Sequence, residues 1–352
     1  MRPVLKPALR RLWRDETTLQ LGIDPARAVV LADVGPTEAR LLAALDGTLD
    51  RAGVRRAADA LGVPPAAADR LLDLLAQADV LDDGAAGASL TQLHQPDRER
   101  LIPDRASLSL VYAGPGAADR VLAHRRTAAV QVVGAGRVGA PLAALLAAAG
   151  VGHIETRDPL ACRSADAAPG GVTTDDAGLP RERAATAAVR RAAPDVSNTR
   201  PTDRPADLTV LTGGPMSTGE QDAVLRAQVP HLAAGIRETT GVVGPLVLPG
   251  VTACLRCLDL TRTERDPGWS RLAAQLAGGR ERAADPCDVV LAALVAAQAA
   301  GQALSFLDRA VIGGALPPSV NGTLEVAMPD WRWRRRSWTP HPACGCSWVQ
   351  SA

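Results

Sequence analysis

The sequence predicts an α/β fold: a Rossmann-like domain, in which helices cover both faces of a parallel sheet, preceded by a small α+β domain. Three observations support this prediction. Short apolar strands alternate with alanine-rich helices from Ser107 onward, a glycine-rich turn follows one of the strands, and cysteines recur in two close pairs. We expect residues 1–84 to form the first domain, 85–106 a linker and 107–352 the second domain.

The composition favours a soluble, cytoplasmic protein. The chain has 352 residues, 47% of them apolar, and a formal net charge of +1, so it can bury a substantial core. We find neither an uninterrupted apolar run of about 18 residues nor a secretion leader, so we expect no membrane attachment. The near-neutral charge also argues against nucleic-acid binding.

The first domain is expected to contain three short strands followed by three helices. Apolar stretches separated by turn-like pairs predict strands at 12–14, 18–23 and 28–34. Helical spacing of leucine and alanine predicts helices at 37–45, 51–61 and 65–78. This winged-helix-like layout suits a peptide-binding module, a DNA-binding module or a purely structural cap.

The second domain is expected to alternate strands with helices and then to change character near its end. The predicted strands are 129–133, 153–157, 208–212, 231–234, 323–328 and 331–338. The predicted helices are 138–149, 181–193, 221–228 and 288–307.

A glycine turn joins the strand at 129–133 to the next helix. Gly134, Gly136 and Gly139 keep the G-x-G-x-x-G spacing, which lets backbone N–H groups approach phosphates. Asp158 closes the following strand, where a carboxylate can hold ribose hydroxyls. With Arg137 inside the turn, these residues form the predicted nucleotide site. The alternative is a turn needed only for close packing of strand and helix.

Two cysteine pairs predict a structural zinc site at a corner of the second domain. Cys254 and Cys257 form a CxxC pair, and Cys344 and Cys346 form a CxC pair some ninety residues later. Four thiolates in two tight pairs suit a closed tetrahedral zinc site, and in a reducing cytosol such pairs hold metal more often than disulfides. The alternatives are a reactive dithiol, free thiols, or His341 as a substitute ligand.

Two cysteines fall outside these pairs. Cys287 precedes the long apolar helix, and a helix N-terminus lowers the pKa of a thiol, so Cys287 is a candidate nucleophile. The competing interpretation is a small buried residue at the start of a core helix. Cys162 has no partner that the sequence identifies.

With both motifs placed, residues 107–352 resemble the ThiF/MoeB adenylating family, relatives of ubiquitin-activating enzymes. The glycine turn, the ribose aspartate and the split zinc cysteines occur in the order of that family. The resemblance implies a fold that binds ATP with magnesium, adenylates a peptide C-terminus and usually forms a homodimer.

The sequence departs from this family around the phosphates. Gly213-Gly214-Pro215 stands where the family has an aspartate for magnesium, and Pro159-Leu160-Ala161-Cys162 replaces an arginine-bearing segment. The family lysine near the start of the helix at 181–193 is absent, so Arg181 or Arg183 is the candidate replacement. Because phosphoryl and nucleotidyl transfer depend on cations placed around the phosphates, these losses argue against efficient adenylation.

The first domain resembles the PqqD-like leader-recognition element of ribosomal peptide biosynthesis. The resemblance implies that an extended leader peptide adds to the third strand and packs against the third helix. The residues that it implies for peptide binding are Val29, Val30, Leu31, Arg70, Leu71 and Leu74.

The order of the two domains, with residues 262–269 after the CxxC pair, resembles the partner proteins of cyclodehydratases that make thiazole/oxazole-modified peptides. In such systems a YcaO-type enzyme performs the ATP-dependent cyclisation. We therefore expect a leader-peptide-binding scaffold with a degenerate adenylating site, acting beside a YcaO-type cyclodehydratase.

Three alternatives stay open. One is an ATP-dependent peptide adenylyltransferase of the microcin type. A nicotinamide-dependent oxidoreductase would explain the glycine turn but not the cysteine pairs. A DNA-binding regulator would need a basic third helix, whereas the predicted helix sets Arg70 against Asp69 and Asp73.

Overall fold

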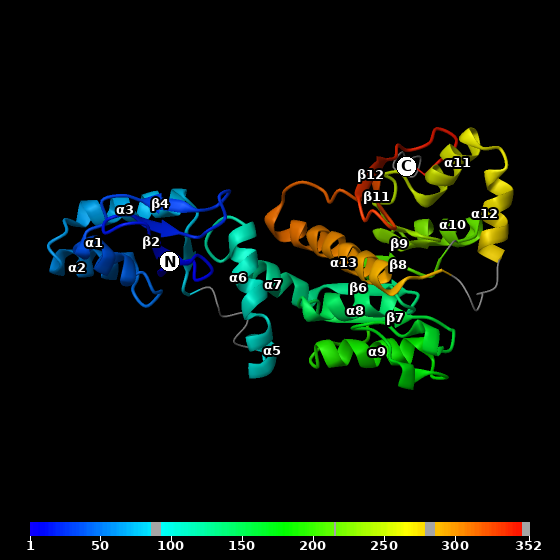
Figure 1. The fold of residues 1–352 in the computed structure, drawn as a ribbon, viewed down its shortest axis with the longest axis horizontal. Helices are drawn as coiled ribbons and strands as arrows, with labels where there is room; N and C mark the ends of the chain where they lie inside the picture. The colour runs from blue at the N-terminus through cyan, green and yellow to red at the C-terminus, as the bar shows by residue number, and fades with distance from the viewer. Residues whose placement is uncertain (86–92, 215, 279–285, 347–352) are drawn as a thin grey trace. The chain divides into compact units, whose positions relative to one another are not determined.

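The computed structural model describes residues 1–85, 93–214, 216–278 and 286–346 (Figure 1). The chain forms two compact units, residues 1–123 and 124–352. We call them unit 1 and unit 2.

Unit 1 combines two small antiparallel sheets with helices. One sheet pairs β1 with β5, and the other has the order β2-β3-β4. The strands are β1 (Pro3–Leu5), β2 (Arg11–Trp13), β3 (Leu19–Leu21), β4 (Val29–Leu31) and β5 (Leu81–Asp83). The helices are α1 (Pro36–Ala43), α2 (Arg51–Ala60), α3 (Pro65–Gln77), α5 (Gln95–Arg100), α6 (Ile102–Val111) and α7 (Ala117–Thr127), and the unit boundary falls within α7.

A single hydrophobic core joins β3 to the first three helices. Leu21, Leu41, Val54 and Leu72 are among its buried residues. Asp50 caps α2 by accepting the backbone N–H of Gly53 at 2.7 Å, which satisfies a donor that the first helical turn leaves open. The three predicted strands and three predicted helices are confirmed, with ends that shift by at most a few residues.

The predicted linker at 85–106 is wrong in its second half. Residues 95–111 form α5 and α6, and Leu101 and Leu108 are buried. Arg105 pairs with Asp119 at 2.7 Å, which ties this segment to α7. Prolines near the start of both helices suggested a loop, but proline is tolerated in the first turn of a helix.

Unit 2 is built on a seven-stranded mixed sheet with the order β12-β11-β10-β9-β8-β6-β7. Strands β7, β6, β8 and β9 are parallel, whereas β10, β11 and β12 continue the sheet in antiparallel fashion. The strands are β6 (Ala129–Val133), β7 (His153–Arg157), β8 (Leu208–Leu211), β9 (His231–Arg237), β10 (Thr240–Val247), β11 (Gly322–Ala327) and β12 (Trp333–Ser337). The predicted parallel sheet is therefore correct for one half only.

The helices of unit 2 are α8 (Gly139–Ala148), α9 (Arg181–Ala192), α10 (Thr218–Arg226), α11 (Leu255–Arg265), α12 (Trp269–Gly278) and α13 (Val289–Ile312). Of these, α8, α9 and α13 contact strands of the sheet, whereas α12 contacts α11. Short 3-10 turns lie at Ser164–Asp166 and Thr174–Asp176. The strands at 129–133 and 153–157 have their predicted bounds, but β10, α11 and α12 lie where the sequence predicted no element.

Helix α13 is, among the described residues, the one helix long and apolar enough to suit a membrane span. Its Leu291, Val295 and Leu307 are instead buried in the main core of unit 2, against residues of β9 and β10. A buried ion pair between Arg125 and Asp308, with both contacts at 2.7 Å, holds the far end of the helix. The apolar composition of α13 is thus explained by core packing.

Candidate functional site

The glycine turn leaves the end of β6 and starts α8. Gly134 has φ +95°, and a Cβ at that position would lie 2.6 Å from the backbone nitrogen of Gly213. A Cβ on Gly139 would overlap the carbonyl oxygen of Gly134. These two positions need glycine for packing alone. Gly136 differs, because a Cβ there would meet open space and the residue is partly exposed.

Asp158 follows β7, and its carboxylate lies against the glycine turn. Oδ2 accepts the N–H of Ala135 at 2.8 Å, and Oδ1 accepts the N–H of Leu160 at 3.0 Å. The residue is only 7% exposed. Each carboxylate oxygen has a second lone pair, so Asp158 can still accept hydrogen bonds from two hydroxyl groups.

Arg181, the first residue of α9, lies beside Asp158 in a buried ion-pair network. Its Nε and Nη2 donate to the two carboxylate oxygens of Asp166 at 2.9 and 2.8 Å. Its Nη1 lies 3.7 Å from Oδ2 of Asp158. Because the guanidinium already contacts two carboxylates and is buried, Arg181 positions Asp158 and is not an exposed group that would contact phosphate. Arg183, the other candidate, is exposed on α9.

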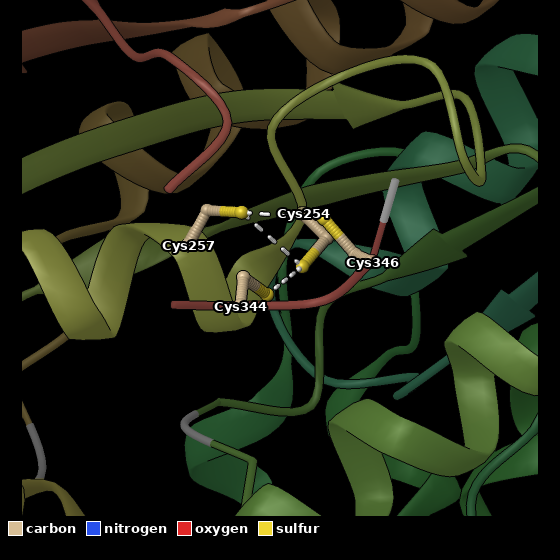
Figure 2. A group of neighbouring side chains, drawn as sticks. All are labelled: Cys254, Cys257, Cys344 and Cys346. Carbon is tan, nitrogen blue, oxygen red and sulfur yellow. Dashed lines mark hydrogen bonds between the residues drawn. The ribbon is translucent and has the colours of Figure 1, made fainter. Parts of the chain in front are cut away.

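The four paired cysteines converge at one corner of unit 2 (Figure 2). The Sγ atom of Cys254 lies 3.7 Å from that of Cys257 and 3.5 Å from that of Cys344, and Cys257 lies 3.4 Å from Cys346. All four sulfur atoms lie within 4.8 Å of one another. A tetrahedral ion with metal–sulfur bonds of about 2.3 Å needs sulfur separations of about 3.8 Å. The cluster can therefore hold a metal ion.

Local contacts prepare Cys257 to be a thiolate ligand. The thiol of Cys254 and the N–H of His341 both donate to its sulfur, the latter at 3.3 Å. These hydrogen bonds, chiefly that from Cys254, lower the pKa of Cys257, while the same contact raises the pKa of Cys254. The imidazole of His341 points to other partners, since its Nε2 lies 2.9 Å from Glu264. His341 thus supports the cluster through its backbone and is not one of its ligands.

Comparison with known proteins identifies the fold. Residues 115–210, which contain the glycine turn, Asp158 and Arg181, match the model of the ThiF family. The fold is of the ThiF/MoeB type. This finding confirms the predicted fold class. No curated protein matches the chain in sequence.

Solved structures extend the likeness beyond the ThiF segment. A structure of E. coli MccB with AMPCPP and MccA has a TM-score of 0.69 and 15% identity, and the match covers 99% of both chains. MccB with ATP has a TM-score of 0.68 and 15% identity, over 98% of this chain and 99% of MccB. PaaA has a TM-score of 0.65 and 16% identity, over 94% of this chain and 99% of PaaA. The likeness therefore includes the fold of unit 1.

The ThiF-type site lacks a carboxylate after β8 within the described chain up to residue 214. Thr212, Gly213 and Gly214 follow the strand. The hydroxyl of Thr212 donates to the carbonyl oxygen of Gly134 at 2.8 Å and so braces the glycine turn. Sequence reasoning missed this role of Thr212, although its place directly after a central strand could have indicated it. Pro215 lies outside the described residues.

Arg137 links the glycine turn to the segment before α13. Its Nη1 donates to the carbonyl oxygen of Cys287 at 2.6 Å, and its buried Nε has no acceptor among the described residues. Burial raises the pKa of the Cys287 thiol, and the positive charge of Arg137 opposes this effect only in part. The expected activation of Cys287 by a helix N-terminus is therefore not supported, because desolvation has the larger effect. Burial likewise raises the pKa of Cys162.

The residues predicted to bind peptide lie on β4 and α3 of unit 1. Within the described structure β4 pairs with β3 alone, so its other edge is open. Val30 is 47% exposed and Leu74 is 63% exposed, and Arg70 is exposed as well. Val29, Leu31 and Leu71 pack in part against the core of unit 1.

Proposed function

We propose that this protein binds a precursor peptide with unit 1 and activates that peptide with ATP at the glycine turn of unit 2. One observation carries the proposal. The chain joins a unit with an open, apolar strand edge to a ThiF-type unit, and this arrangement is matched over its whole length by MccB structures with MccA and with ATP. This reading replaces the non-catalytic scaffold as the leading function.

The proposed reaction is transfer of an adenylyl group to a peptide carboxylate. A carboxylate oxygen attacks the α-phosphorus of ATP, a new C–O–P linkage forms, and the bond to pyrophosphate breaks. Pyrophosphate leaves with the bonding electrons, and the peptide becomes an acyl adenylate. The reaction needs the attacking oxygen in line with the leaving group and the phosphate charge neutralised.

The residues around the turn suit this reaction. Backbone N–H groups near Gly136 and at the start of α8 would bind phosphate oxygens. Asp158 would accept hydrogen bonds from the ribose hydroxyls, and Arg181 would hold that carboxylate in place. Arg137 would supply positive charge at the turn.

A second function is favoured by the glycines after β8. Mg²⁺ bound to a nucleotide usually takes one or two protein carboxylates, and Gly213 and Gly214 offer none. In this alternative the protein delivers the leader peptide, and a YcaO-type cyclodehydratase makes the new bond.

We also propose that the protein forms a homodimer, which analytical ultracentrifugation would test.

We further propose that the cysteine cluster holds structural zinc. Four sulfur ligands fill the tetrahedral shell, so no position is left for substrate. The ion would join the start of α11 to the segment that follows β12.

Nucleotide binding tests the proposal directly. Calorimetric titration of the full chain with ATP and MgCl₂ is expected to show one site per chain. The Asp158→Asn variant should bind about tenfold more weakly, because the amide replaces a charged acceptor of ribose hydroxyls. Absence of ATP binding to the wild-type protein, combined with binding of a leader peptide, would favour the delivery function.

A further inference from the structure

Lys6, the only lysine of the chain, lines a cavity within unit 1. The cavity has a volume of about 190 Å³. Its charged lining residues are Lys6, Arg27 and Asp79, and most of its other lining residues are apolar. The space exceeds what one water molecule needs, so it can receive a side chain.

The ammonium group of Lys6 is buried with incomplete partners. Its side chain is 1% exposed, and Nζ lies 2.8 Å from Oδ2 of Asp79. The described residues offer Nζ no other acceptor. Asp79 also accepts the N–H of Gly114 at 2.9 Å, so its carboxylate interacts with both Lys6 and Gly114. An ammonium group has three hydrogens, and a buried donor without an acceptor is costly.

The cavity lies where the proposed peptide-binding elements end. Ala26 and Arg27 precede β4 by two or three residues. Ala78 and Asp79 follow directly after α3. A peptide that adds to the open edge of β4 and packs on α3 would therefore reach this cavity beside the start of β4.

The charge of the cavity selects the chemistry of the guest. Two cations against one carboxylate leave a net positive charge, and the buried ammonium has free hydrogens. An anionic oxygen would satisfy these hydrogens through charge-assisted bonds. Asp79 would repel such a group, but it is 37% exposed at its side chain and so is partly screened by solvent.

We propose that this cavity binds the side-chain carboxylate of an aspartate or glutamate in the precursor peptide. The inference rests on the proposed binding of a peptide along β4. A side chain is the source of the carboxylate, because the proposed function uses the C-terminal carboxylate in the reaction. The cavity thus sets the register of the peptide on the strand.

The test uses peptides selected by the full-length protein. Random twelve-residue peptides displayed on phage are selected against it, and the best peptide is synthesised with capped termini. We expect one acidic position in the selected set. Replacing that residue by its amide counterpart should weaken binding about tenfold, measured by fluorescence polarisation.

Protein variants assign that effect to the cavity. Lys6→Met should bind the acidic and amide peptides equally, whereas Arg56→Met removes an exposed cation of α2 and should keep the preference. Asp79→Asn should increase the preference for the acidic peptide several-fold, and asparagine tolerates the φ of +53° found there. This second variant tests the inference even if Lys6→Met does not fold.

The outcomes separate the inference from the proposed function. If no peptide is selected, or if Val30→Ser and Leu74→Ser leave binding unchanged, peptide binding along β4 is wrong and the inference fails with it. If those two variants weaken binding but no acidic preference exists, or if the preference survives both Lys6→Met and Asp79→Asn unchanged, only the cavity inference is overturned.

Discussion

The guanidinium of Arg181 lies 3.7 Å from the carboxylate of Asp158 while it forms a two-point ion pair with Asp166. All three residues are buried. The network joins the start of α9 to the end of β7 and fixes the carboxylate that faces the glycine turn. It therefore couples the stability of unit 2 to the geometry of the nucleotide site.

Loss of Arg181 should destabilise the protein strongly. Arg181→Met leaves the buried charge of Asp166 without its main partner, and breaking a buried pair in this way costs about 3–5 kcal/mol. Arg181→Lys should cost less, since it keeps one charged contact but not the two-point geometry. Urea unfolding measures both free energies. A loss below about 1 kcal/mol in Arg181→Met would contradict the account of this network.

Two glycines of the turn should respond differently to alanine. Gly139→Ala forces a Cβ against the carbonyl oxygen of Gly134, so we expect a loss of several kcal/mol in unfolding free energy. Gly136→Ala meets open space, so stability should change by less than about 1 kcal/mol while ATP affinity falls. Thermal melts and calorimetry with ATP measure the two effects. Equal destabilisation by both changes would show that Gly136 is also a packing residue.

Removal of the metal should loosen the corner of unit 2. The purified protein is expected to contain one zinc ion per chain by plasma mass spectrometry. Cys254→Ser or Cys346→Ser should lose the ion and lower the melting temperature, because the ion joins α11 to the segment after β12. Cys287→Ser is the matched control and should keep the ion. Retention of full zinc in Cys346→Ser would remove that residue from the ligand set.

Acid should destabilise the protein in part through His231. Burial lowers the pKa of this residue below its usual value of 6.5, so the folded state holds it neutral. Below pH of about 6.5 the unfolded chain binds the proton first, and the free energy of unfolding falls by at most about 1.4 kcal/mol per pH unit from this group. The His231→Gln variant should show a shallower decline between pH 7 and 5. An unchanged slope would exclude His231 as a source of acid sensitivity.

The sequence located the local features of the fold well. The period of the apolar residues and the turn residues beside them placed β6 and β7 at their observed bounds. The spacing within each cysteine pair indicated the cluster, because such spacing can be recognised in a short stretch of sequence. The strand at 240–247 was missed, since Gly241, Gly244 and Pro245 interrupt its apolar pattern. In the antiparallel half, β9 pairs with β10 and β11 pairs with β12 as neighbours in sequence, and only the pairing of β10 with β11 joins distant segments, which no local pattern specifies.

The candidate site was predictable in its residue types but not in their partners. The spacing of Gly134, Gly136 and Gly139 did not show that only the middle glycine has room for a Cβ. The pairing of Arg181 with Asp166 joins residues fifteen positions apart through a folded loop, so it appears only in the structure. Lys6 stood out in the sequence by its rarity alone, and its cavity is formed by residues that follow α3 together with Leu110 of α6.

Pyrophosphate exchange tests the central claim most directly. The full chain, loaded with zinc, is incubated with ATP, MgCl₂, labelled pyrophosphate and the precursor peptides encoded by neighbouring genes. We predict incorporation of label into ATP that depends on the peptide and falls at least tenfold in Asp158→Asn. Tight binding of the same peptide without any exchange would contradict adenylation and establish delivery of the peptide as the function.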